Sequence, residues 1–215
     1  MRIYDTVLFD LDGTLLDTLD DLTDSANHIL ETNGYPIRTR AEIRSFLGNG
    51  SRRLIARALP YGEETPRFEE LFSDYKAWYN SHCEMKTMPY PGVENVLREL
   101  RAAGCAAAIV TNKHAAAAAP LRERFFPGVT VIGQRDGLRQ KPSPDMVEEA
   151  LSQLGKTRKG AVYVGDSEVD FQTARNAGLP CILVTWGFRD REQLAKLEPE
   201  HLADTPQELL KLLVR

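Results

Sequence analysis

The chain has 215 residues, of which 42% are hydrophobic and 27% are charged, and its formal net charge is −4 at pH 7. This balance suits one large domain, or a core domain with a smaller insertion, and supplies enough apolar residues for a sizeable core. The negative charge and the lack of a basic run argue against nucleic acid as a partner. No stretch has the length of a membrane span, and the N-terminus has no apolar signal-peptide core, so we expect no membrane attachment.

The cysteines are few and scattered. Cys83, Cys105 and Cys181 form no Cys-X-X-Cys pair. An odd count without clustering favours reduced thiols over a disulfide framework and argues against a zinc site. We therefore expect a cytoplasmic protein. The sequence leaves the oligomeric state open between a monomer and a homodimer.

Strands and helices alternate along most of the chain. Nearly continuous apolar runs predict buried parallel strands, because a strand covered by helices on both faces has no polar side. These runs are Thr6–Phe9, Cys105–Val110, Val129–Gly133, Ala161–Val164 and Cys181–Thr185. Helical spacing of apolar residues predicts helices at Val93–Ala103, from Ser143 or Asp145 to Gly155, at Glu168–Ala177 and at Pro206–Leu213. The alternation predicts an α/β fold with a doubly wound parallel sheet.

Two carboxylates follow the first predicted strand. Asp10 and Asp12 lie two residues apart on an extended chain, so their side chains point to one side, and Gly13 lets the backbone turn there. Such close carboxylates repel each other, and a bound Mg²⁺ could hold Asp10 ionised. Asp10 would then attack phosphorus, while Asp12 would protonate the leaving alcohol and later activate water. The alternatives are a merely acidic turn or part of a calcium loop, whose later ligands are missing here.

Residues 17–83 interrupt the alternation. No convincing strand lies there, and helices are predicted from Leu19 to Leu30, at Ala41–Phe46, at Ser51–Leu59 and at Pro66–His82. We interpret residues 17–83 as a helical cap domain and residues 1–16 with 84–215 as the core, with Met88–Gly92 as a stiff linker. An insertion after the first strand stands over the sheet edge where α/β folds bind ligands, so it is a natural lid.

One loop of the insertion is a candidate for substrate binding. Gly48, Asn49 and Gly50 could let the cap backbone approach a small substrate. Arg52, followed by Arg53, could meet a carboxylate or a second phosphate. The alternative is a turn between helices with solvated arginines. The aromatic residues Tyr75, Trp78 and Tyr79 are expected to form the packing face of a helix.

Polar groups also follow the later strands. Thr111 and Asn112 end the second main strand, where a hydroxyl and a backbone N–H can hold phosphate oxygens. Lys141, before Pro142, could neutralise charge near Asp10. Each of these motifs also has an interpretation without a function. Thr111 and Asn112 could form a turn or a helix cap, and Lys141 could be an exposed lysine in a proline-rich turn.

A last pair of carboxylates completes the set. Gly165 and Asp166 directly follow the predicted strand Ala161–Val164, so Asp166 lies at the carboxyl end of that strand. Asp170 comes four residues later, one helical turn on, and returns to the same face. Carboxylates suit Mg²⁺. Capping of the following helix is the alternative role, and a supporting role beyond the direct metal ligands is open for Asp170. Because the carboxyl ends of parallel strands meet at one edge, we expect all these motifs to converge on one site.

These motifs resemble those of the haloacid dehalogenase superfamily of phosphohydrolases, over nearly the whole chain. The segment from Asp10 to Thr14 resembles the first motif of the family, Thr111 the second, Lys141 the third, and Gly165–Asp170 the fourth. The helical insertion resembles the family's C1-type cap.

The resemblance implies a Rossmann-like core with Asp10 as nucleophile and Asp12 as acid and base. It also implies a required Mg²⁺, held by Asp10, the backbone carbonyl of Asp12 and Asp166, with Asp170 nearby. The dehalogenase and phosphonatase branches lack the second aspartate, so Asp12 argues against their reactions.

Within this superfamily the chain is most similar to phosphoglycolate phosphatases, through the segments Leu47–Gly50, Val110–Lys113, Lys141–Pro144 and Val184–Phe188. We therefore expect a Mg²⁺-dependent phosphatase acting on a small phosphorylated metabolite, with 2-phosphoglycolate as the leading candidate. The alternatives are a pyrophosphatase or sugar phosphatase of the same family, a mutase of the β-phosphoglucomutase type, and a protein that only binds a phosphate ligand.

Overall fold

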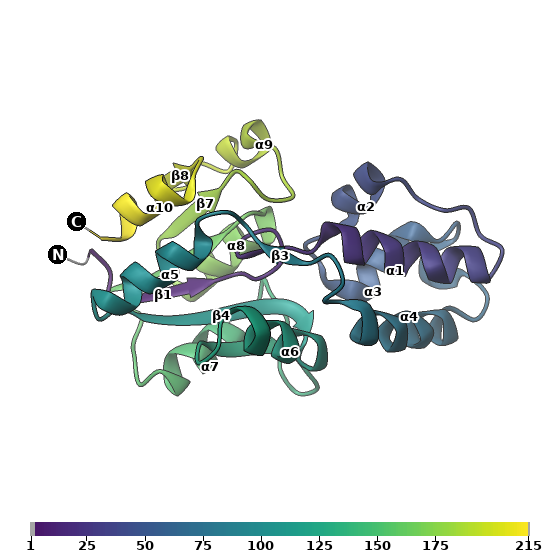
Figure 1. Ribbon diagram of the computed structural model, residues 1–215, viewed down its shortest axis with the longest axis horizontal. Coiled ribbons are helices and arrows are strands. Elements are labelled where there is room, and N and C mark those ends of the chain that lie inside the picture. Colours follow the sequence, from purple (N-terminus) through teal and green to yellow (C-terminus); the bar gives the residue numbers. More distant parts are fainter. Residues whose placement is uncertain (1–2, 215) are drawn as a thin grey trace.

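The computed structural model describes residues 3–214, so residues 1, 2 and 215 of the predicted core lie outside the described part. Figure 1 shows a sheet covered by helices and, beside it, a group of four helices, α1 to α4. The first described residues and the C-terminal helix α10 (Pro206–Leu213) lie on the side of the sheet that faces away from these four helices (Figure 1).

The sheet has six strands in the order β5-β4-β1-β6-β7-β8, and every neighbouring pair is parallel. The strands are β1 (Thr6–Phe9), β4 (Ala106–His114), β5 (Thr130–Gln134), β6 (Ala161–Gly165), β7 (Cys181–Val184) and β8 (His201–Ala203). The doubly wound parallel sheet predicted from the sequence is confirmed, as are its five predicted strands. The edge strand β8 was not predicted.

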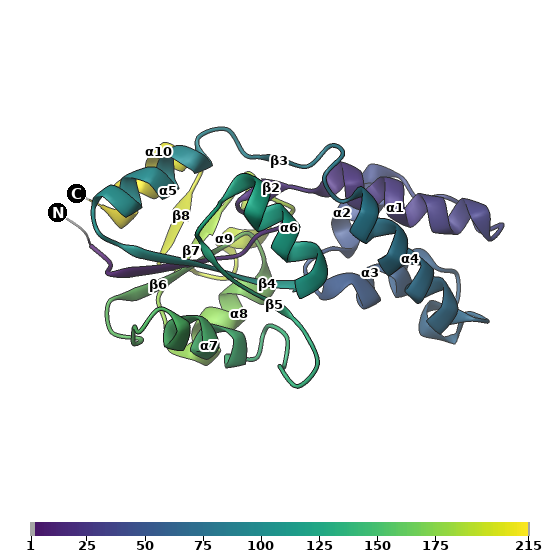
Figure 2. The ribbon, with the colours of Figure 1, turned by 60° about the horizontal axis from the view of Figure 1, so that its bottom comes forward.

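Helices cover both faces of this sheet. One face carries α5 (Val93–Ala102), α6 (Ala115–Phe125) and α10 (Pro206–Leu213), and the other carries α7 (Asp145–Gln153), α8 (Glu168–Ala177) and α9 (Arg191–Ala195). Figure 2 shows α5 and α10 on one side of the strands and α7 and α8 on the other. Residues alternate along β1, so that Phe9 packs into the first layer and Leu8 into the second. Burial of each such side chain contributes about 1.5–3 kcal/mol.

The inserted segment forms its own helical layer. It contains α1 (Leu19–Thr32), α2 (Arg40–Phe46), α3 (Gly50–Ala58), a short 3₁₀ helix (Gly62–Glu64) and α4 (Phe68–His82). The four predicted helices of this segment are therefore confirmed. Whether it is a separate domain with the predicted limits stays a prediction.

The connections to this helical layer run as a pair. β2 (Leu16–Asp17) and β3 (Met88–Pro89) form a two-stranded antiparallel ribbon, so the expected stiff linker is partly a strand. Asp21 is buried beside the ribbon and accepts hydrogen bonds from the backbone N–H groups of Lys86 and Thr87, both at 2.9 Å. These bonds fix the outgoing chain against the start of α1.

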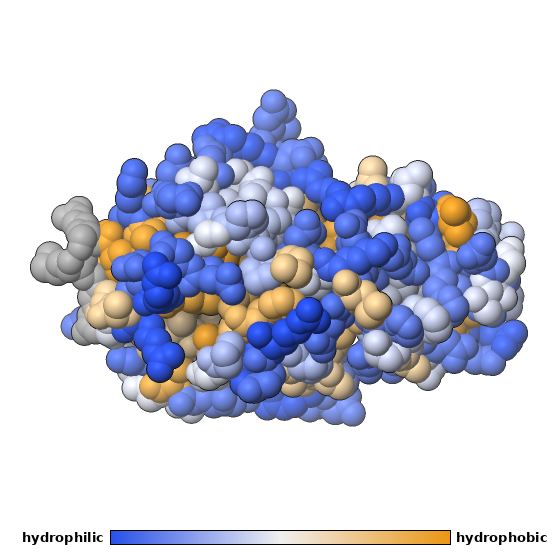
Figure 3. Space-filling view, in the orientation of Figure 1, coloured by the Kyte–Doolittle hydropathy of each residue, from blue (hydrophilic) through white to orange (hydrophobic). Residues whose placement is uncertain are grey.

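The surface is mostly hydrophilic on the face shown in Figure 3, with apolar areas over the sheet-containing half. Large exposed apolar side chains are scattered, for example Ile37 on the helical insertion and Met88 on β3. Within residues 3–214, no helix combines the length and apolar character that a membrane span needs.

Candidate active site

Asp10 and Asp12 lie in the loop that leaves the central strand. The backbone N–H of Asp10 still donates to the carbonyl of Val164 on β6 at 2.9 Å, so the first carboxylate is fixed by the sheet. Its own Oδ1 accepts from the backbone N–H of Leu11 at 2.7 Å. Asp10 is buried, whereas the side chain of Asp12 is partly exposed and forms an ion pair with Lys113 at 2.7 Å. The two carboxylates therefore have different environments.

Gly13 allows the tight turn after these aspartates. Its φ is +87°, and a Cβ built there would lie 2.4 Å from Oδ2 of Asp166. Only glycine combines this backbone conformation with such a close approach. The turn therefore depends on the absence of a side chain, and it brings the β1 loop against the carboxylate of Asp166.

Asp166 and Asp170 are held at the start of α8. Ser167 caps this helix, and Oδ2 of Asp170 accepts from the hydroxyl of Ser167 at 2.6 Å and from the backbone N–H of Asp166 at 3.2 Å. Oδ2 of Asp166 accepts from the backbone N–H of Phe188 at 2.7 Å, and Oδ1 accepts from the hydroxyl of Thr14 at 3.2 Å. Asp170 therefore does take part in capping α8, the alternative role considered from the sequence, and its side chain is also buried beside Asp166.

Lys141 joins the two groups of carboxylates. Its ammonium nitrogen lies 2.8 Å from Oδ1 of Asp10 and 2.8 Å from Oδ1 of Asp170, and it donates to the hydroxyl of Tyr163 at 3.1 Å. Burial alone would lower the pKa of Lys141, but the carboxylates of Asp10 and Asp170 more than offset this and raise it well above its usual value. Lys141 is therefore a buried, charged lysine that contacts Asp10 directly.

The carboxylates suit a cation. One oxygen each of Asp10, Asp166 and Asp170 lies within 4.8 Å of the others, and all three residues are buried. Burial, with the charge of Asp170, raises the pKa of Asp10 well above its usual range and raises that of Asp166 to about 7. Oxygen ligands crowded in this way fit a hard divalent cation such as Mg²⁺. Both oxygens of Asp170 already accept hydrogen bonds, so it has less freedom to bind a cation than Asp10 or Asp166.

Thr111 and Asn112 belong to β4, next to Asp10. Both are buried and both line the cavity described below. Asn112 exchanges hydrogen bonds with the backbone of Lys141, donating to its carbonyl at 3.1 Å and accepting from its N–H at 2.7 Å. It also donates to the carbonyl of Gly48 in the insertion at 3.4 Å. Asn112 thus positions the lysine loop and touches the helical layer above it.

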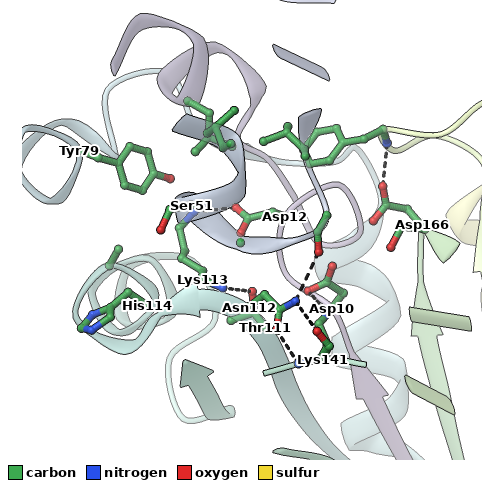
Figure 4. A pocket seen from close by; sticks show the side chains of 18 of the residues that line it. Asp10, Asp12, Ser51, Tyr79, Thr111, Asn112, Lys113, His114, Lys141 and Asp166 are labelled. Carbon is green, nitrogen blue, oxygen red and sulfur yellow. Dashed lines mark hydrogen bonds and ion pairs between the residues drawn. The ribbon is translucent and has the colours of Figure 1, made fainter. Parts of the chain in front are cut away.

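The helical layer closes over these residues. A cavity of about 70 Å³ lies between the two parts, lined by Asp10, Asp12 and Lys141 below and by Gly48, Gly50 and residues of α4 above. It has room for a few water molecules or a small ligand. Figure 4 shows the core side chains of Asp10, Thr111 and Lys141 on one side of the cavity.

The predicted cap residues divide into two groups. Gly48 and Gly50 line the cavity with positive φ, whereas Asn49 precedes α3 without lining it. Arg52 lies outside the cavity, where its guanidinium binds Glu63 at 2.8 Å and Glu69 at 2.6 Å. The structure therefore brings the glycines to the site and leaves Arg52 in an exposed ion-pair cluster.

Several residues that line the cavity were not predicted as site residues, and three of them are polar groups close to Asp12 or to each other. Lys113, beside Asp12, was noted only as part of a family string, and Tyr75 and Tyr79 were expected to be packing residues. Both tyrosines are buried and do stack on each other at 5.8 Å, but they also line the cavity. Helical spacing cannot distinguish a face that packs from a face that borders a cavity. The available signal was the position of Lys113 just beyond the predicted strand Cys105–Val110, next to two polar residues.

The chain also resembles known proteins. A phosphoglycolate phosphatase from Rhodobacter capsulatus is 39% identical over 191 residues, which cover 85% of each chain. An N-acetylmuramic acid 6-phosphate phosphatase from Pseudomonas aeruginosa is 30% identical over 213 residues, which cover 97% of this chain and 94% of that protein. A solved structure of a provisionally assigned phosphoglycolate phosphatase from Lactobacillus delbrueckii subsp. bulgaricus has a TM-score of 0.92 at 35% identity, covering 100% of this chain and 99% of the other.

Sheet, insertion and converging carboxylates together define a protein of the α/β class with a carboxylate-centred site beneath a helical insertion. The model of the haloacid dehalogenase-like hydrolase family matches residues 7–184, so the chain belongs to that family. The family assignment made from the sequence is therefore confirmed. The enzyme class expected from the sequence, a hydrolase of the phosphatase type, is confirmed at that level by the family and the relatives described above.

Proposed function

We propose that this enzyme hydrolyses a small phosphomonoester, with 2-phosphoglycolate as the leading candidate, through an aspartyl-phosphate on Asp10. The observation that carries the proposal is the ion pair of Asp10 with Lys141, buried beside Asp166 and Asp170 at a cavity between the core and the helical insertion. A carboxylate that is buried beside a lysine and a small cavity, and that a bound cation would keep ionised, is equipped to attack phosphorus. The small cavity volume supports a small substrate.

Asp10 and Asp12 divide the reaction between them. An oxygen of Asp10 forms a bond to phosphorus as the bond from phosphorus to the ester oxygen breaks, and Asp12 gives its proton to the leaving alkoxide. Asp12 then takes a proton from the water that attacks the aspartyl-phosphate, and phosphate leaves with Asp10 restored. Asp12 suits the proton transfers because it is partly exposed and lies at the cavity, whereas Asp10 is buried and fixed.

Lys141, Thr111 and Asn112 form the proposed phosphate clamp. Lys141 supplies positive charge beside the attacking oxygen, and Thr111 offers a hydroxyl from the neighbouring strand. Asp10 and Asp166, with the backbone carbonyl of Asp12 and with Asp170 nearby, would hold Mg²⁺. When bound, the cation offsets the carboxylate repulsion and neutralises charge on the transferred group.

The helices α1 to α4 are proposed to act as a lid. Gly48 of the insertion contacts Asn112 of the core through a hydrogen bond, and Arg44 of α2 binds Asp190 at 2.9 Å. A closed lid excludes bulk water from the aspartyl-phosphate and selects substrates by size. This lid is the cap domain expected from the sequence.

A sugar phosphate is the second candidate substrate. The Pseudomonas aeruginosa relative is named for N-acetylmuramic acid 6-phosphate, and it aligns over nearly the whole chain. The cavity of about 70 Å³ favours the smaller substrate in the closed conformation. We also propose a cytoplasmic location and a monomeric or homodimeric state, as expected from the sequence.

Phosphate release with Mg²⁺ from 2-phosphoglycolate, N-acetylmuramic acid 6-phosphate, glucose 6-phosphate and pyrophosphate tests the proposal. We expect the highest kcat/KM with 2-phosphoglycolate. Asp10→Asn, which keeps the side-chain volume and removes the nucleophile, is expected to lower kcat by at least about 10³-fold. A preference for a sugar phosphate would overturn the substrate. Release that persists in Asp10→Asn would overturn the mechanism, and phosphate transfer to glucose 1-phosphate would indicate a mutase.

A further inference from the structure

Two buried hydroxyl groups border the cavity without partners. Tyr75 and Tyr79 of α4 are 1% and 4% exposed, and no group within residues 3–214 forms a hydrogen bond with either phenol oxygen. Stacking explains the position of the rings but not that of the hydroxyls. A buried hydroxyl without a hydrogen-bond partner lowers the stability of the fold by about 1–3 kcal/mol. Phenylalanine at either position would fill the same space without this loss of stability.

A positive charge lies between these tyrosines and the core. The ammonium nitrogen of Lys113, 4.6 Å from the ring centre of Tyr79, also pairs with Asp12. The Lys113 side chain is 4% exposed, and Figure 4 shows it crossing the cavity between Asp12 and Tyr79. An ammonium has three donors, so Lys113 can bind a second anion while it stays near Asp12.

Lys113 and Tyr79 stand on the side of Asp12, away from the buried group of Asp10, Lys141 and Asp166 (Figure 4). Tyr75 stacks on Tyr79 and lines the same cavity. In the proposed reaction, Asp12 faces the ester oxygen, so the groups beyond Asp12 meet the leaving alcohol. The cap arginine expected to meet a carboxylate, Arg52, is occupied by Glu63 and Glu69 outside the cavity. Of the other cations that line the cavity, Lys76 lies over the ring of Phe72 at 4.7 Å and Arg189 binds Glu168 at 2.8 Å. Lys113, beside Asp12, is the cation best placed to meet the non-phosphoryl end of a substrate.

We propose that Lys113, Tyr75 and Tyr79 bind a carboxylate of the substrate, on the carbon chain that becomes the leaving alcohol. The ammonium of Lys113 pairs with this carboxylate, and the two phenols donate hydrogen bonds to it. The site thereby selects small phosphomonoesters of hydroxy acids. The inference rests on the proposed phosphatase function and adds to it the groups that recognise the substrate.

Two matched substrates isolate the carboxylate. 2-Phosphoglycolate and 2-hydroxyethyl phosphate have the same phosphate ester and differ in a carboxylate against a hydroxymethyl group. For the wild-type enzyme we expect kcat/KM to be higher with 2-phosphoglycolate. A site built to bond a charged group commonly discriminates by roughly 10- to 100-fold for each hydrogen bond.

Three variants test the three residues. In Tyr75→Phe, Tyr79→Phe and Lys113→Met, the ratio of the two kcat/KM values is expected to fall by roughly 10-fold or more, mainly through KM for 2-phosphoglycolate. Tyr61→Phe serves as the matched control, because Tyr61 is 70% exposed on the insertion. The ratio of the two kcat/KM values in this variant should equal that of the wild type. Thermal unfolding should show that the Tyr75 and Tyr79 variants fold and lose no stability, since each removes an unsatisfied hydroxyl.

The outcomes separate the two proposals. If the wild type hydrolyses both substrates but the ratio stays unchanged in all three variants, the carboxylate site is wrong and the phosphatase function stands. Equal kcat/KM for both substrates in the wild type leads to the same conclusion. If the wild type releases phosphate from no ester in the presence of Mg²⁺, the proposed function fails and the carboxylate site fails with it. Inhibition by glycolate, weakened in the three variants, would support the site independently of turnover.

Discussion

The side chain of Asp166 shows how single residues set the properties of this site. Its carboxylate is buried between the β1 turn and the backbone N–H of Phe188, and burial with the charge of Asp170 raises its pKa to about 7. Such a raised pKa favours the protonated form in the folded protein. A cation favours the opposite form, because only ionised carboxylates bind it well.

Stabilisation by Mg²⁺ should therefore depend on pH. In the metal-free protein, Asp166 binds a proton more tightly when folded, so its contribution to stability falls as pH rises from about 4 to about 7. Saturating Mg²⁺ at 100 times its Kd would add about 2.7 kcal/mol where the carboxylates are ionised. We expect the rise in Tm caused by Mg²⁺ to be larger at pH 8 than at pH 5. Asp166→Asn should lose most of this rise, and equal wild-type shifts at both pH values would contradict the prediction.

Arg52 is expected to have little effect on activity, because its contacts lie outside the cavity. Its guanidinium binds Glu63 and Glu69 and lies 4.8 Å from the ring centre of Phe68. Exposed ion pairs contribute at most about 1 kcal/mol. Arg52→Ala should change kcat/KM for 2-phosphoglycolate by less than about twofold. A loss comparable to that of Lys113→Met would return Arg52 to the substrate site, where the sequence placed it.

At the scale of elements, the turn after β1 couples backbone conformation to the carboxylate site. Gly13 has a positive φ and leaves no room for a Cβ beside Asp166. Gly34, after α1, has a similar φ of +73°, but nothing lies within 4 Å of a Cβ built there. A side chain at Gly34 would therefore meet backbone strain alone, whereas a side chain at Gly13 would meet both backbone strain and a clash with Asp166.

Replacement of each glycine by alanine should therefore have different results. Gly34→Ala is expected to cost about 1 kcal/mol of stability from strain alone and to leave activity near that of the wild type. Gly13→Ala should cost at least about 2 kcal/mol and displace Asp166, which weakens Mg²⁺ binding as well. The readouts are Tm and the Mg²⁺ concentration for half-maximal activity. An unaltered Mg²⁺ requirement in Gly13→Ala would show that the turn does not position the carboxylate.

The sequence predicted the buried strands well because each is a continuous apolar run flanked by helices. β8, His201–Ala203, escaped prediction because it is short, lies at the sheet edge and begins with a polar residue. The β2–β3 ribbon escaped because two-residue strands carry no periodicity and β3 ends in Pro89. Only the folded chain shows that Leu16 pairs with Pro89, 73 positions further along the sequence.

The candidate site was predictable where chemistry follows strand ends. Asp10, Thr111 and Asp166 each follow an apolar run, and the structure brings them to one cavity with Lys141. Residues contributed by the insertion were harder to assign, because a helix packed over a cavity shows the same apolar spacing as one packed on a core. That is why Tyr75 and Tyr79 were expected to pack and Arg52 to bind, before their surroundings were known.

At the scale of the whole molecule, several polar contacts join the helical layer to the core beside the cavity. Arg44 of α2 binds Asp190 at 2.9 Å and donates to the carbonyl of Gly187 at 3.1 Å, while Arg189 donates to the carbonyl of Leu47 at 2.8 Å. The core partners adjoin Phe188, whose backbone holds Asp166. The core residues that contact the proposed lid and the backbone N–H that holds Asp166 thus belong to the same loop, residues 187–190.

Loss of one of these contacts should weaken closure. Arg44→Ala removes an exposed ion pair and one hydrogen bond, so we expect KM for 2-phosphoglycolate to rise by about 3- to 10-fold, with a smaller effect at high salt. Arg98→Ala is the control, because the Arg98 side chain is 70% exposed on α5, far from the insertion in Figure 1. A KM that is unchanged in Arg44→Ala would show that closure does not depend on this contact.

The β2–β3 ribbon has a consequence for how such enzymes can diversify. Because Leu16 pairs with Pro89, the chain leaves the core and returns to it at neighbouring points. The intervening segment is therefore topologically a long hairpin, which can be exchanged for another insert without rethreading the sheet. Lys113, Asp12 and Lys141 stay with the core, whereas Tyr75, Tyr79 and the glycine loop travel with the insert. The groups proposed to react and part of the groups proposed to select the substrate thus belong to separately replaceable parts of the chain.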